Sequence, residues 1–265
     1  MSDTISILGS GWLGLPLAKM FKSCGYVVKL STTSVSKLDT IKNQKLNPFL
    51  ISIDRNSDSV QYFLRSKYLI INIPSKSSEG FKSFISQIET SEVKHVIYIS
   101  STSVYNTSNE LITESDIFVD HNNPFYIIEQ LFRNNRSFET TIIRFAGLIG
   151  KNRHPGNFFN SGKPIKNPDA PVNLIHQADC IKIIQEIIKQ KVWNETFNAC
   201  TDTHPSKRAF YSFTSKSIGN NIPTFNDSSD STFKQISSER LKKHLNYQFI
   251  YSDLMKIPFE NIDVD

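Results

Sequence analysis

A glycine-rich turn near the start of the chain constrains the fold more than any other feature. The apolar run Ile5–Leu8 leads directly into Gly9-Ser10-Gly11-Trp12-Leu13-Gly14, and a helical pattern follows through Phe21. In a strand–turn–helix unit of this spacing, the first glycine makes the sharp turn, the second lets a diphosphate approach, and the third lets helix and strand pack closely. The free N–H groups of the helix then face the phosphates. The turn predicts dinucleotide binding; the alternative is that its glycines serve only a tight turn.

Short apolar runs alternate with helical patterns through the first half of the chain. Buried strands separated by helices are typical of a parallel sheet with helices on both faces. The sequence therefore predicts an α/β fold of the Rossmann type, a doubly wound parallel sheet. Its six expected strands are Ile5–Leu8, Tyr26–Leu30, Phe49–Ile53, Tyr68–Ile73, His95–Ile99 and Thr140–Phe145.

The regular alternation stops after about residue 150, where the chain becomes richer in Asn, Pro, Ser and Lys. One more helical pattern follows at Gln177–Lys189, and a strand-like run lies at Thr196–Ala199. We therefore expect two domains with interleaved chain contributions. Residues 1–150 form a nucleotide-binding domain, and residues 151–265 form a smaller α/β lobe that binds substrate near the carboxyl edge of the sheet, where ligands of such folds bind.

Charge and composition exclude several classes of protein. The 30 Lys and Arg residues exceed the 25 Asp and Glu residues, which gives a formal charge of +5, but the basic residues are scattered. This charge suits a small anionic ligand, and no aromatic-interleaved basic stripe favours nucleic acid. The basic residues of the C-terminal region, Lys207 and Lys234 among them, are expected to form a solvated face, with an anion-binding site as the alternative.

The cellular setting also follows from composition. No apolar run approaches the roughly 20 residues of a membrane span. The three cysteines, Cys24, Cys180 and Cys200, are far apart and form no cluster with metal-ligand spacing, so we expect a reducing compartment and no metal site. The first motif begins at Gly9, which leaves no room for a leader peptide, so we expect a cytoplasmic protein.

The residues after the second strand bear on the choice of coenzyme. An acid near this position binds the ribose hydroxyls in the NAD version of the fold. Here Thr32 and Thr33 supply hydroxyls, Lys37 lies just beyond, and no acid is present. This pattern favours NADP over NAD; alternatively, these residues cap the next helix. Asp54, at the end of the third strand, is expected either to accept a hydrogen bond from the adenine amino group or to turn the chain.

Further motifs carry a family resemblance over nearly the whole chain. The fifth strand runs into a dense set of hydroxyls, and glycine-rich and histidine-containing segments follow. With these motifs the chain resembles the extended short-chain dehydrogenase/reductase superfamily, its NAD(P)-dependent epimerase/dehydratase family and, within it, a YeeZ-like branch. The motifs are Gly11–Gly14, Ser100-Ser101-Thr102-Ser103-Val104-Tyr105, Ile143–Gly150, Arg153–Gly156, Asn173–Asp179 and His204–Ser206.

The resemblance implies a set of catalytic residues. A hydroxyl at Ser101 would polarise the substrate oxygen, a Tyr about 25 residues later would act as acid and base, and a Lys four residues after it would lower the pKa of that Tyr. In this register the Tyr is Tyr126, but Gln130 stands at the Lys position and supplies no charge. A second register, anchored on Glu129-Gln130, leaves no Tyr/Lys pair. Tyr126 can also be an ordinary residue of an amphipathic helix.

The loop after the sixth strand holds the candidate substrate residues. Arg153 can bind an anionic substrate through two hydrogen bonds, with His154 beside it, or it can pack on the second lobe. Farther on, Asp179 or Gln177 is expected to satisfy backbone N–H groups at a helix start. The resemblance implies an NAD(P)-dependent oxidoreductase- or epimerase-like enzyme with a small polar substrate, a nucleoside-diphosphate sugar being one candidate. The alternative is a coenzyme-binding sensor without hydride chemistry.

Overall fold

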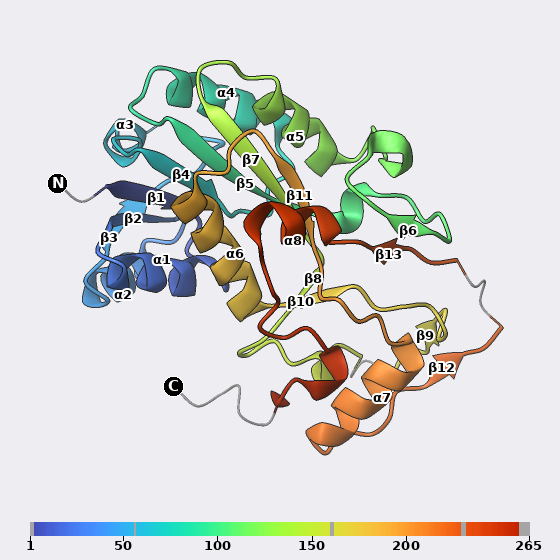
Figure 1. Cartoon of the computed structure of the whole chain (residues 1–265). Coiled ribbons are helices and arrows are strands. Elements are labelled where there is room, and N and C mark those ends of the chain that lie inside the picture. Colours follow the sequence, from blue (N-terminus) through green and yellow to red (C-terminus); the bar gives the residue numbers. More distant parts are fainter. Residues whose placement is uncertain (1–2, 56, 160–161, 229–231, 260–265) are drawn as a thin grey trace. The chain divides into compact units, whose positions relative to one another are not determined.

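The computed structural model describes residues 3–55, 57–159, 162–228 and 232–259, and within them seven strands form one sheet (Figure 1). Strand β1 pairs in parallel with β2 and β4, β2 with β3, and β4 with β5. The order reverses between β1 and β4, as in a doubly wound sheet, so the predicted fold class is confirmed. Across the sheet, the strands are β11 (Thr196–Ala199), β7 (Glu139–Phe145), β5 (His95–Ser101), β4 (Tyr68–Ile71), β1 (Thr4–Leu8), β2 (Val27–Thr32) and β3 (Asn47–Leu50).

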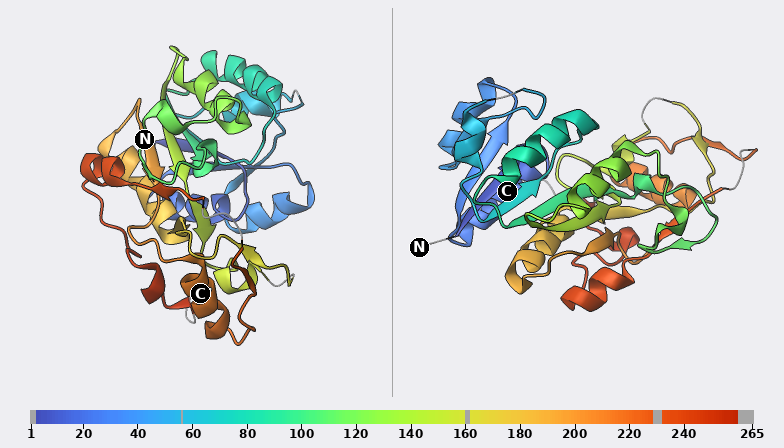
Figure 2. Two further views of the ribbon diagram at one scale, coloured as in Figure 1. Left: turned by 90° about the vertical axis from the view of Figure 1, so that its right-hand side faces the viewer. Right: turned by 90° about the horizontal axis from the view of Figure 1, so that it is seen from above.

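Helices cover both faces of this sheet. α1 (Gly14–Ser23) and α2 (Ser36–Asn43) lie on one face, and α3 (Ser59–Phe63), α4 (Ser78–Glu89) and α5 (Pro124–Arg133) lie on the other (Figure 1; further views in Figure 2). Because both faces are covered, the central strand β4 is buried along its whole length. Apolar side chains of α3, α4 and α5 share one core with those of β4 and β5.

The seventh strand was not expected in this sheet. The run Thr196–Ala199 was predicted to be strand-like but was placed in the second lobe, whereas in the structure β11 is an edge strand beside β7. The six predicted strands are all present, and their ends shift by up to three residues. Strand β3 differs most, because it begins at Asn47 and ends at Leu50.

The remaining strands are short and form three parallel two-stranded sheets, β10–β8, β12–β9 and β13–β6. The strands are β6 (Leu111–Ile112), β8 (Gly147–Ile149), β9 (Ile165–Lys166), β10 (Leu174–His176), β12 (Phe225–Asn226) and β13 (Gln235–Ile236). The α-helices are α6 (Gln177–Gln190), α7 (Lys207–Ser217) and α8 (Glu239–Leu245), and the 3-10 helices are η1 (Thr102–Val104), η2 (Asp116–Phe118), η3 (Pro155–Asn157) and η4 (Leu254–Lys256).

The chain alternates between two compact units. The first unit comprises the chain up to Ser101 together with His121–Ile143 and Ile184–Thr196. The second comprises Thr102–Asp120, Arg144–Ile183 and the chain from Phe197 onward. Neither unit is therefore one continuous segment of sequence.

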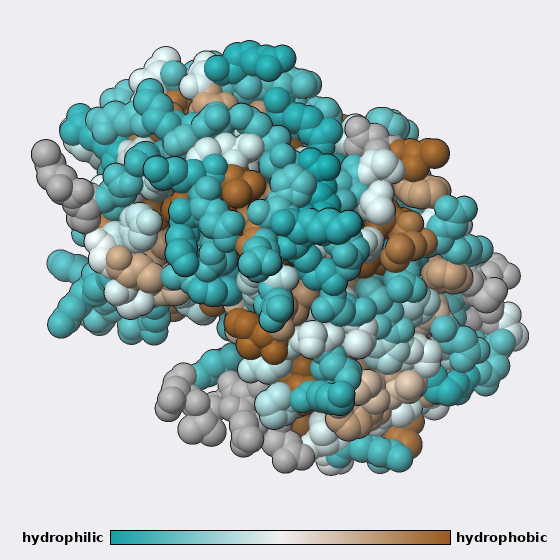
Figure 3. All heavy atoms as spheres, viewed as in Figure 1, coloured by the Kyte–Doolittle hydropathy of each residue, from teal (hydrophilic) through white to brown (hydrophobic). Residues whose placement is uncertain are grey.

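The surface is mainly polar on the face that Figure 3 shows, where hydrophobic residues appear as small separate areas. Exposed apolar side chains do occur, and Ile117 and Val35 are the most exposed of them. None of the helices in the described ranges is both long enough and apolar enough to cross a bilayer.

Candidate functional site

The glycine turn follows β1 and requires glycine at two of its positions. Gly9 has φ +106°, and a Cβ built on it would lie 2.5 Å from the carbonyl oxygen of Asn72. A Cβ on Gly14 would overlap the carbonyl oxygen of Gly9. The first glycine thus allows the turn to pass over the end of β4, and the third allows α1 to approach the turn. Both roles agree with those expected from the spacing.

Gly11 has a different environment, because a Cβ built on it would meet no atom within 4 Å. The backbone at this position therefore borders open space. Leu13 is the N-cap residue of α1, and no side-chain hydrogen bond caps the first turn of this helix. In this first turn the Leu15 N–H donates to the Gly11 carbonyl at 3.2 Å and Pro16 has no N–H, so the N–H groups that can attract an anion are those that precede Leu15, at the positive end of the helix dipole. Gly11 and the start of α1 thus form a cradle suited to a phosphate group.

A pocket of about 430 Å³ extends from the glycine turn across the ends of β1, β2, β3 and β4. It lies at the point where the strand order reverses, which is where doubly wound folds bind nucleotides. The pocket brings together six of the predicted coenzyme residues, namely Gly9, Ser10, Gly11, Thr32, Thr33 and Asp54. Trp12, Leu13 and Gly14 do not line it: Trp12 lies in the turn, Leu13 is the N-cap residue of α1, and Gly14 is the first residue of that helix. Sequence reasoning missed Asn72 and Ser75, which follow β4 and also line the pocket.

The end of β2 is tied to the glycine turn by side-chain hydroxyls. The Gly9 N–H donates to Ser31 Oγ at 2.9 Å, and the Ser34 N–H donates to Thr32 Oγ1 at 3.1 Å. Thr33 and Lys37 complete this side of the pocket. The wall at the end of β2 is therefore made of hydroxyls and one cation, with no carboxyl group.

Asp54 lines the opposite side of the pocket, but its carboxyl group is also close to α4. A Cβ on Gly80, in the first turn of α4, would lie 2.5 Å from Asp54 Oδ1. A carboxylate near the start of a helix is favourably placed in the field of the helix dipole. This position suits the structural alternative for Asp54 as well as the adenine contact.

The region around Ser101 and α5 is organised by a buried pair. Ser100 Oγ donates to Glu129 Oε1 at 2.5 Å, so Ser100 faces α5. Ser101 is the last residue of β5, and the chain passes directly from it into η1. Tyr126 is buried on α5, and its ring packs edge-on against His121 with centroids 5.1 Å apart. Asn123 caps α5 by accepting a hydrogen bond from the Phe125 N–H.

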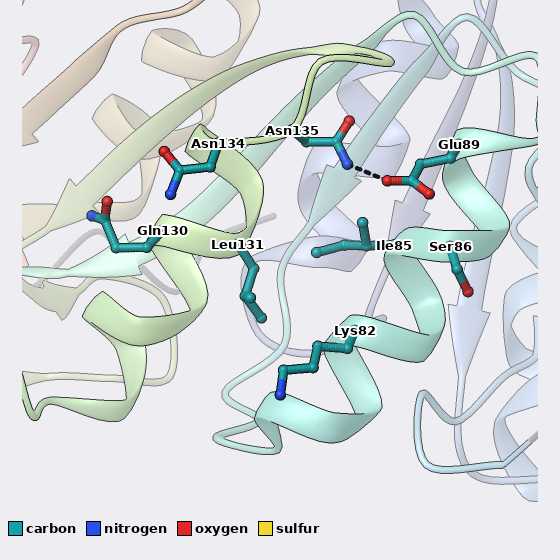
Figure 4. Close-up of a pocket in the computed structure, with 8 residues that line it drawn as sticks. All are labelled: Lys82, Ile85, Ser86, Glu89, Gln130, Leu131, Asn134 and Asn135. Carbon is teal, nitrogen blue, oxygen red and sulfur yellow. Dashed lines mark hydrogen bonds between the residues drawn. The ribbon is translucent and has the colours of Figure 1, made fainter.

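Gln130 occupies a different place from the glycine-turn pocket. Its side chain lines a surface depression of about 340 Å³ between α4 and α5, where Lys82, Glu89 and Asn135 also lie (Figure 4). Asn135 Nδ2 donates to Glu89 Oε1 at 2.6 Å across this depression. The structure thus brings the residue predicted at the Lys position to the α4–α5 groove, and it is not among the residues that line the pocket at the glycine turn.

Arg153 and His154 lie in a tight turn of the second unit. The Arg153 N–H donates to the Gly150 carbonyl at 2.9 Å, and the Arg153 side chain is exposed. His154 Nδ1 accepts a hydrogen bond from the Gly156 N–H at 3.0 Å, and its ring packs against Phe259. His154 therefore caps the short helix η3, whereas Arg153 is accessible to an anionic ligand.

Sequence reasoning missed a polar network around η1 in the second unit. Arg144 is fully buried, and its Nη1 donates to Tyr105 Oη at 2.6 Å, which in turn donates to Asn198 Oδ1 at 2.8 Å. Burial raises the pKa of Tyr105, and the Arg144 guanidinium opposes this shift. Lys234 donates to the carbonyl oxygens of Thr102 and Tyr105. Lys234 is half-buried, so the expectation of a solvated face is wrong for this residue.

Comparisons with known proteins are consistent with this geometry. No family model matches the chain. Protein YeeZ of Escherichia coli (strain K12) is 28% identical over 272 residues, which cover 97% of this chain and 99% of that protein. A short-chain dehydrogenase/reductase superfamily protein from Agrobacterium tumefaciens, solved with bound NAD, aligns with a TM-score of 0.78 at 15% identity over 96% of this chain and 95% of that one.

UDP-glucuronic acid 4-epimerase from Bacillus cereus, solved in complex with UDP-glucuronic acid and NAD, aligns with a TM-score of 0.76 at 16% identity over 98% of each chain. The structural likeness shows a common fold, and the sequence likeness extends over the whole length of the chain. The resemblance predicted from the motifs is thereby confirmed. The chain is similar in sequence to Protein YeeZ over 97% of its length, and its Rossmann-type fold is the one found in the short-chain dehydrogenase/reductase and sugar-nucleotide epimerase structures compared above.

Proposed function

We propose that this protein binds a nicotinamide dinucleotide at the glycine turn and acts as an oxidoreductase- or epimerase-like enzyme on a small polar substrate. The observation that carries the proposal is the cradle at Gly11, where a Cβ would meet no atom within 4 Å beside the uncapped start of α1. A diphosphate fits this combination of space and N–H donors. When bound, the coenzyme supplies a hydride acceptor or donor, and the chain supplies binding and orientation.

The pocket favours NADP over NAD. Thr32, Thr33 and Lys37 line it at the end of β2. A carboxylate at this position would bind a ribose 2′-hydroxyl, whereas hydroxyls and an ammonium group suit a 2′-phosphate. Asn72 and Ser75 add polar contacts on the β4 side. The two structures compared above were solved with NAD, so a preference for NADP would distinguish this chain from them.

We assign the following roles to the chain's own side chains. Ser101, the last residue of β5, orients a substrate oxygen. Tyr126 moves a proton, and its burial on α5 removes it from bulk water. Free Tyr has a pKa of about 10, so a proton carrier at neutral pH needs a nearby positive charge. Arg153 is exposed and can bind the anionic part of a substrate.

A coenzyme-binding sensor without turnover is the second candidate. One observation favours the sensor. Gln130 stands where the resemblance implies a catalytic Lys, and its side chain lines the α4–α5 depression. Without that positive charge, the bias that lowers the pKa of Tyr126 must come from elsewhere. The sensor would bind the coenzyme through the same glycine turn.

Calorimetry on ligand-stripped protein with NADPH and NADH tests the coenzyme assignment. We expect tighter binding of NADPH; uptake of neither nucleotide would overturn the proposal. Turnover is then measured as a change in nicotinamide absorbance with UDP-sugars and other polar carbonyl or alcohol substrates. Loss of that signal in Ser101→Ala supports the enzyme, and unchanged turnover removes Ser101 from the mechanism. NADPH binding without turnover of any such substrate favours the sensor.

A further inference from the structure

The position of Lys234 is fixed by its neighbours in the second unit. Asn173 Nδ2 donates to the Lys234 carbonyl at 2.7 Å, and Asn173 Oδ1 accepts from the Ile236 N–H at 2.9 Å. The next residue, Gln235, is also held, because its N–H donates to the Glu110 carbonyl at 3.2 Å. The backbone that carries Lys234 is thus held from both sides, so the direction of its side chain is set by the fold.

The ammonium group of Lys234 is bound to the turn that follows Ser101 in the sequence. Its Nζ donates to the Thr102 carbonyl at 3.0 Å and to the Tyr105 carbonyl at 2.6 Å. These two bonds use two of its three N–H donors. Among the described residues, no carboxylate lies within ion-pair distance of Nζ, and burial alone lowers the pKa of this lysine.

A half-buried cation that has no counter-charge among the residues the structure describes is costly, because burial removes hydration and carbonyl dipoles replace only part of it. A neutral side chain could hold the two carbonyls equally well. The neighbouring cation Arg144 differs, since Glu114 lies close enough for the two charges to interact. The charge of Lys234 and its third donor are therefore available to a ligand.

We propose that Lys234 binds an anionic oxygen of the substrate, of the phosphate type found in a nucleoside diphosphate, while it holds the turn Thr102–Tyr105 in place. This inference rests on the proposed function, because the turn follows the residue that we expect to orient the substrate. Among the basic residues of the C-terminal region, Lys234 would then be the one that binds a ligand. Lys234 is a substrate-binding residue in this proposal, and its bonds to the two carbonyls position the turn.

The test compares Lys234→Gln with wild type in calorimetric titrations of UDP and of inorganic pyrophosphate. The protein is first saturated with NADPH, so that the glycine turn is occupied. Glutamine retains N–H donors for the carbonyls but removes the charge. We expect the affinity for both probes to fall at least tenfold, with uridine binding unchanged and NADPH affinity within twofold of wild type. Lys207→Gln is the matched control, because Lys207 is also partly buried with a lowered pKa and donates to the Lys166 carbonyl.

Amide hydrogen exchange over residues 102–106 separates binding from a purely structural role. We expect the exchange of these amides to be the same in Lys234→Gln and wild type, because the turn keeps its hydrogen bonds. Equal affinities of variant and wild type for both probes, or no binding of either probe to wild type, would overturn the proposal. If NADPH does not bind, the proposed function fails, yet the difference between wild type and Lys234→Gln still measures the role of Lys234.

Discussion

Ser100 Oγ donates a 2.5 Å hydrogen bond to Glu129 Oε1, and both side chains are buried between β5 and α5. This pair determines which face of α5 meets the sheet. Tyr126 lies one turn earlier on the same buried face, whereas the amide group of Gln130 points away from α4 in Figure 4. The hydrogen bond to Glu129 also directs the Ser100 side chain toward α5.

Removal of the Glu129 carboxyl group is expected to destabilise the fold. Glu129→Ala leaves the buried Ser100 hydroxyl without this acceptor and opens a cavity, so we expect the free energy of unfolding to fall by about 2–4 kcal/mol. Glu129→Gln keeps an acceptor oxygen and should cost less. Urea unfolding measures both. Gln130→Ala is the control and should change the free energy of unfolding by less than about 1 kcal/mol; an equal loss in both alanine variants would contradict the special role of Glu129.

The sequence predicted the features that depend on local patterns. The periodicity and composition of short segments identified the strands, and the spacing of Gly9, Gly11 and Gly14 predicted the turn that borders the pocket for which we propose coenzyme binding. Each of these signals lies within a few residues of sequence. The resemblance named Ser101 and Tyr126 as site residues. Their roles stay predictions.

Contacts between distant parts of the chain could not be predicted in this way. The sequence pattern predicts that Asp179 or Gln177 satisfies backbone N–H groups at the start of a helix, and Asp179 does lie in the first turn of α6. Instead it accepts hydrogen bonds from Tyr247 Oη and from the N–H groups of Ile250 and Tyr251. The solvated face expected for Lys234 has a similar origin. Nothing near Lys234 in the sequence indicates that its side chain contacts the turn Thr102–Tyr105.

Two glycines of the turn are expected to respond differently to the same substitution. Gly11→Ala adds a Cβ into open space, so the free energy of unfolding should change by less than about 1 kcal/mol. The same methyl group occupies the space for the diphosphate, and we expect at least tenfold weaker NADPH binding in calorimetry. Gly14→Ala places a Cβ onto the Gly9 carbonyl oxygen and should destabilise the protein by several kcal/mol. Unaltered NADPH affinity in Gly11→Ala would remove the cradle from the binding site.

Lys37 should determine the preference between the two coenzymes. Lys37→Ala removes the cation that lines the pocket at the end of β2. We expect NADPH affinity to fall about tenfold, which corresponds to about 1.4 kcal/mol, and NADH affinity to change little. Titration of the variant with both nucleotides checks this. A parallel loss for NADPH and NADH would mean that Lys37 does not contact a 2′-phosphate; Lys42→Ala, on the exposed part of α2, serves as the control.

Asp179 is expected to hold the segment 247–251. Its carboxyl group is fully buried and accepts three hydrogen bonds, two at Oδ1 and one at Oδ2. Asp179→Asn replaces one acceptor oxygen with an NH₂ group that faces a donor, so we expect a loss of about 1–3 kcal/mol in the free energy of unfolding. Amide exchange of Ile250 and Tyr251 should accelerate as well. Unchanged protection of these two amides would contradict the assigned role.

His176 should make the stability of the protein depend on pH in mildly acidic solution. Burial lowers its pKa to about 4, compared with about 6.5 for a free histidine, so the folded state holds the neutral ring. The unfolded chain binds the proton first as the pH falls below about 6.5, and stability is therefore fully present above that pH and decreases down to about pH 4. The total loss from this group is at most about 3 kcal/mol, at about 1.4 kcal/mol per pH unit. Urea unfolding at intervals between pH 7 and pH 4 measures this slope.

The matched variant is His176→Asn, because an amide oxygen can replace Nδ1 as the acceptor for the Ala178 N–H. We expect the variant to be less stable than wild type at pH 7 and to lose less stability as the pH falls to 4, since the titrating ring is gone. His244→Asn, at an exposed position of α8, should keep the wild-type slope. If His176→Asn and wild type lose stability in parallel between pH 6.5 and pH 4, the acid sensitivity belongs to other groups, and the buried imidazole does not titrate in this range.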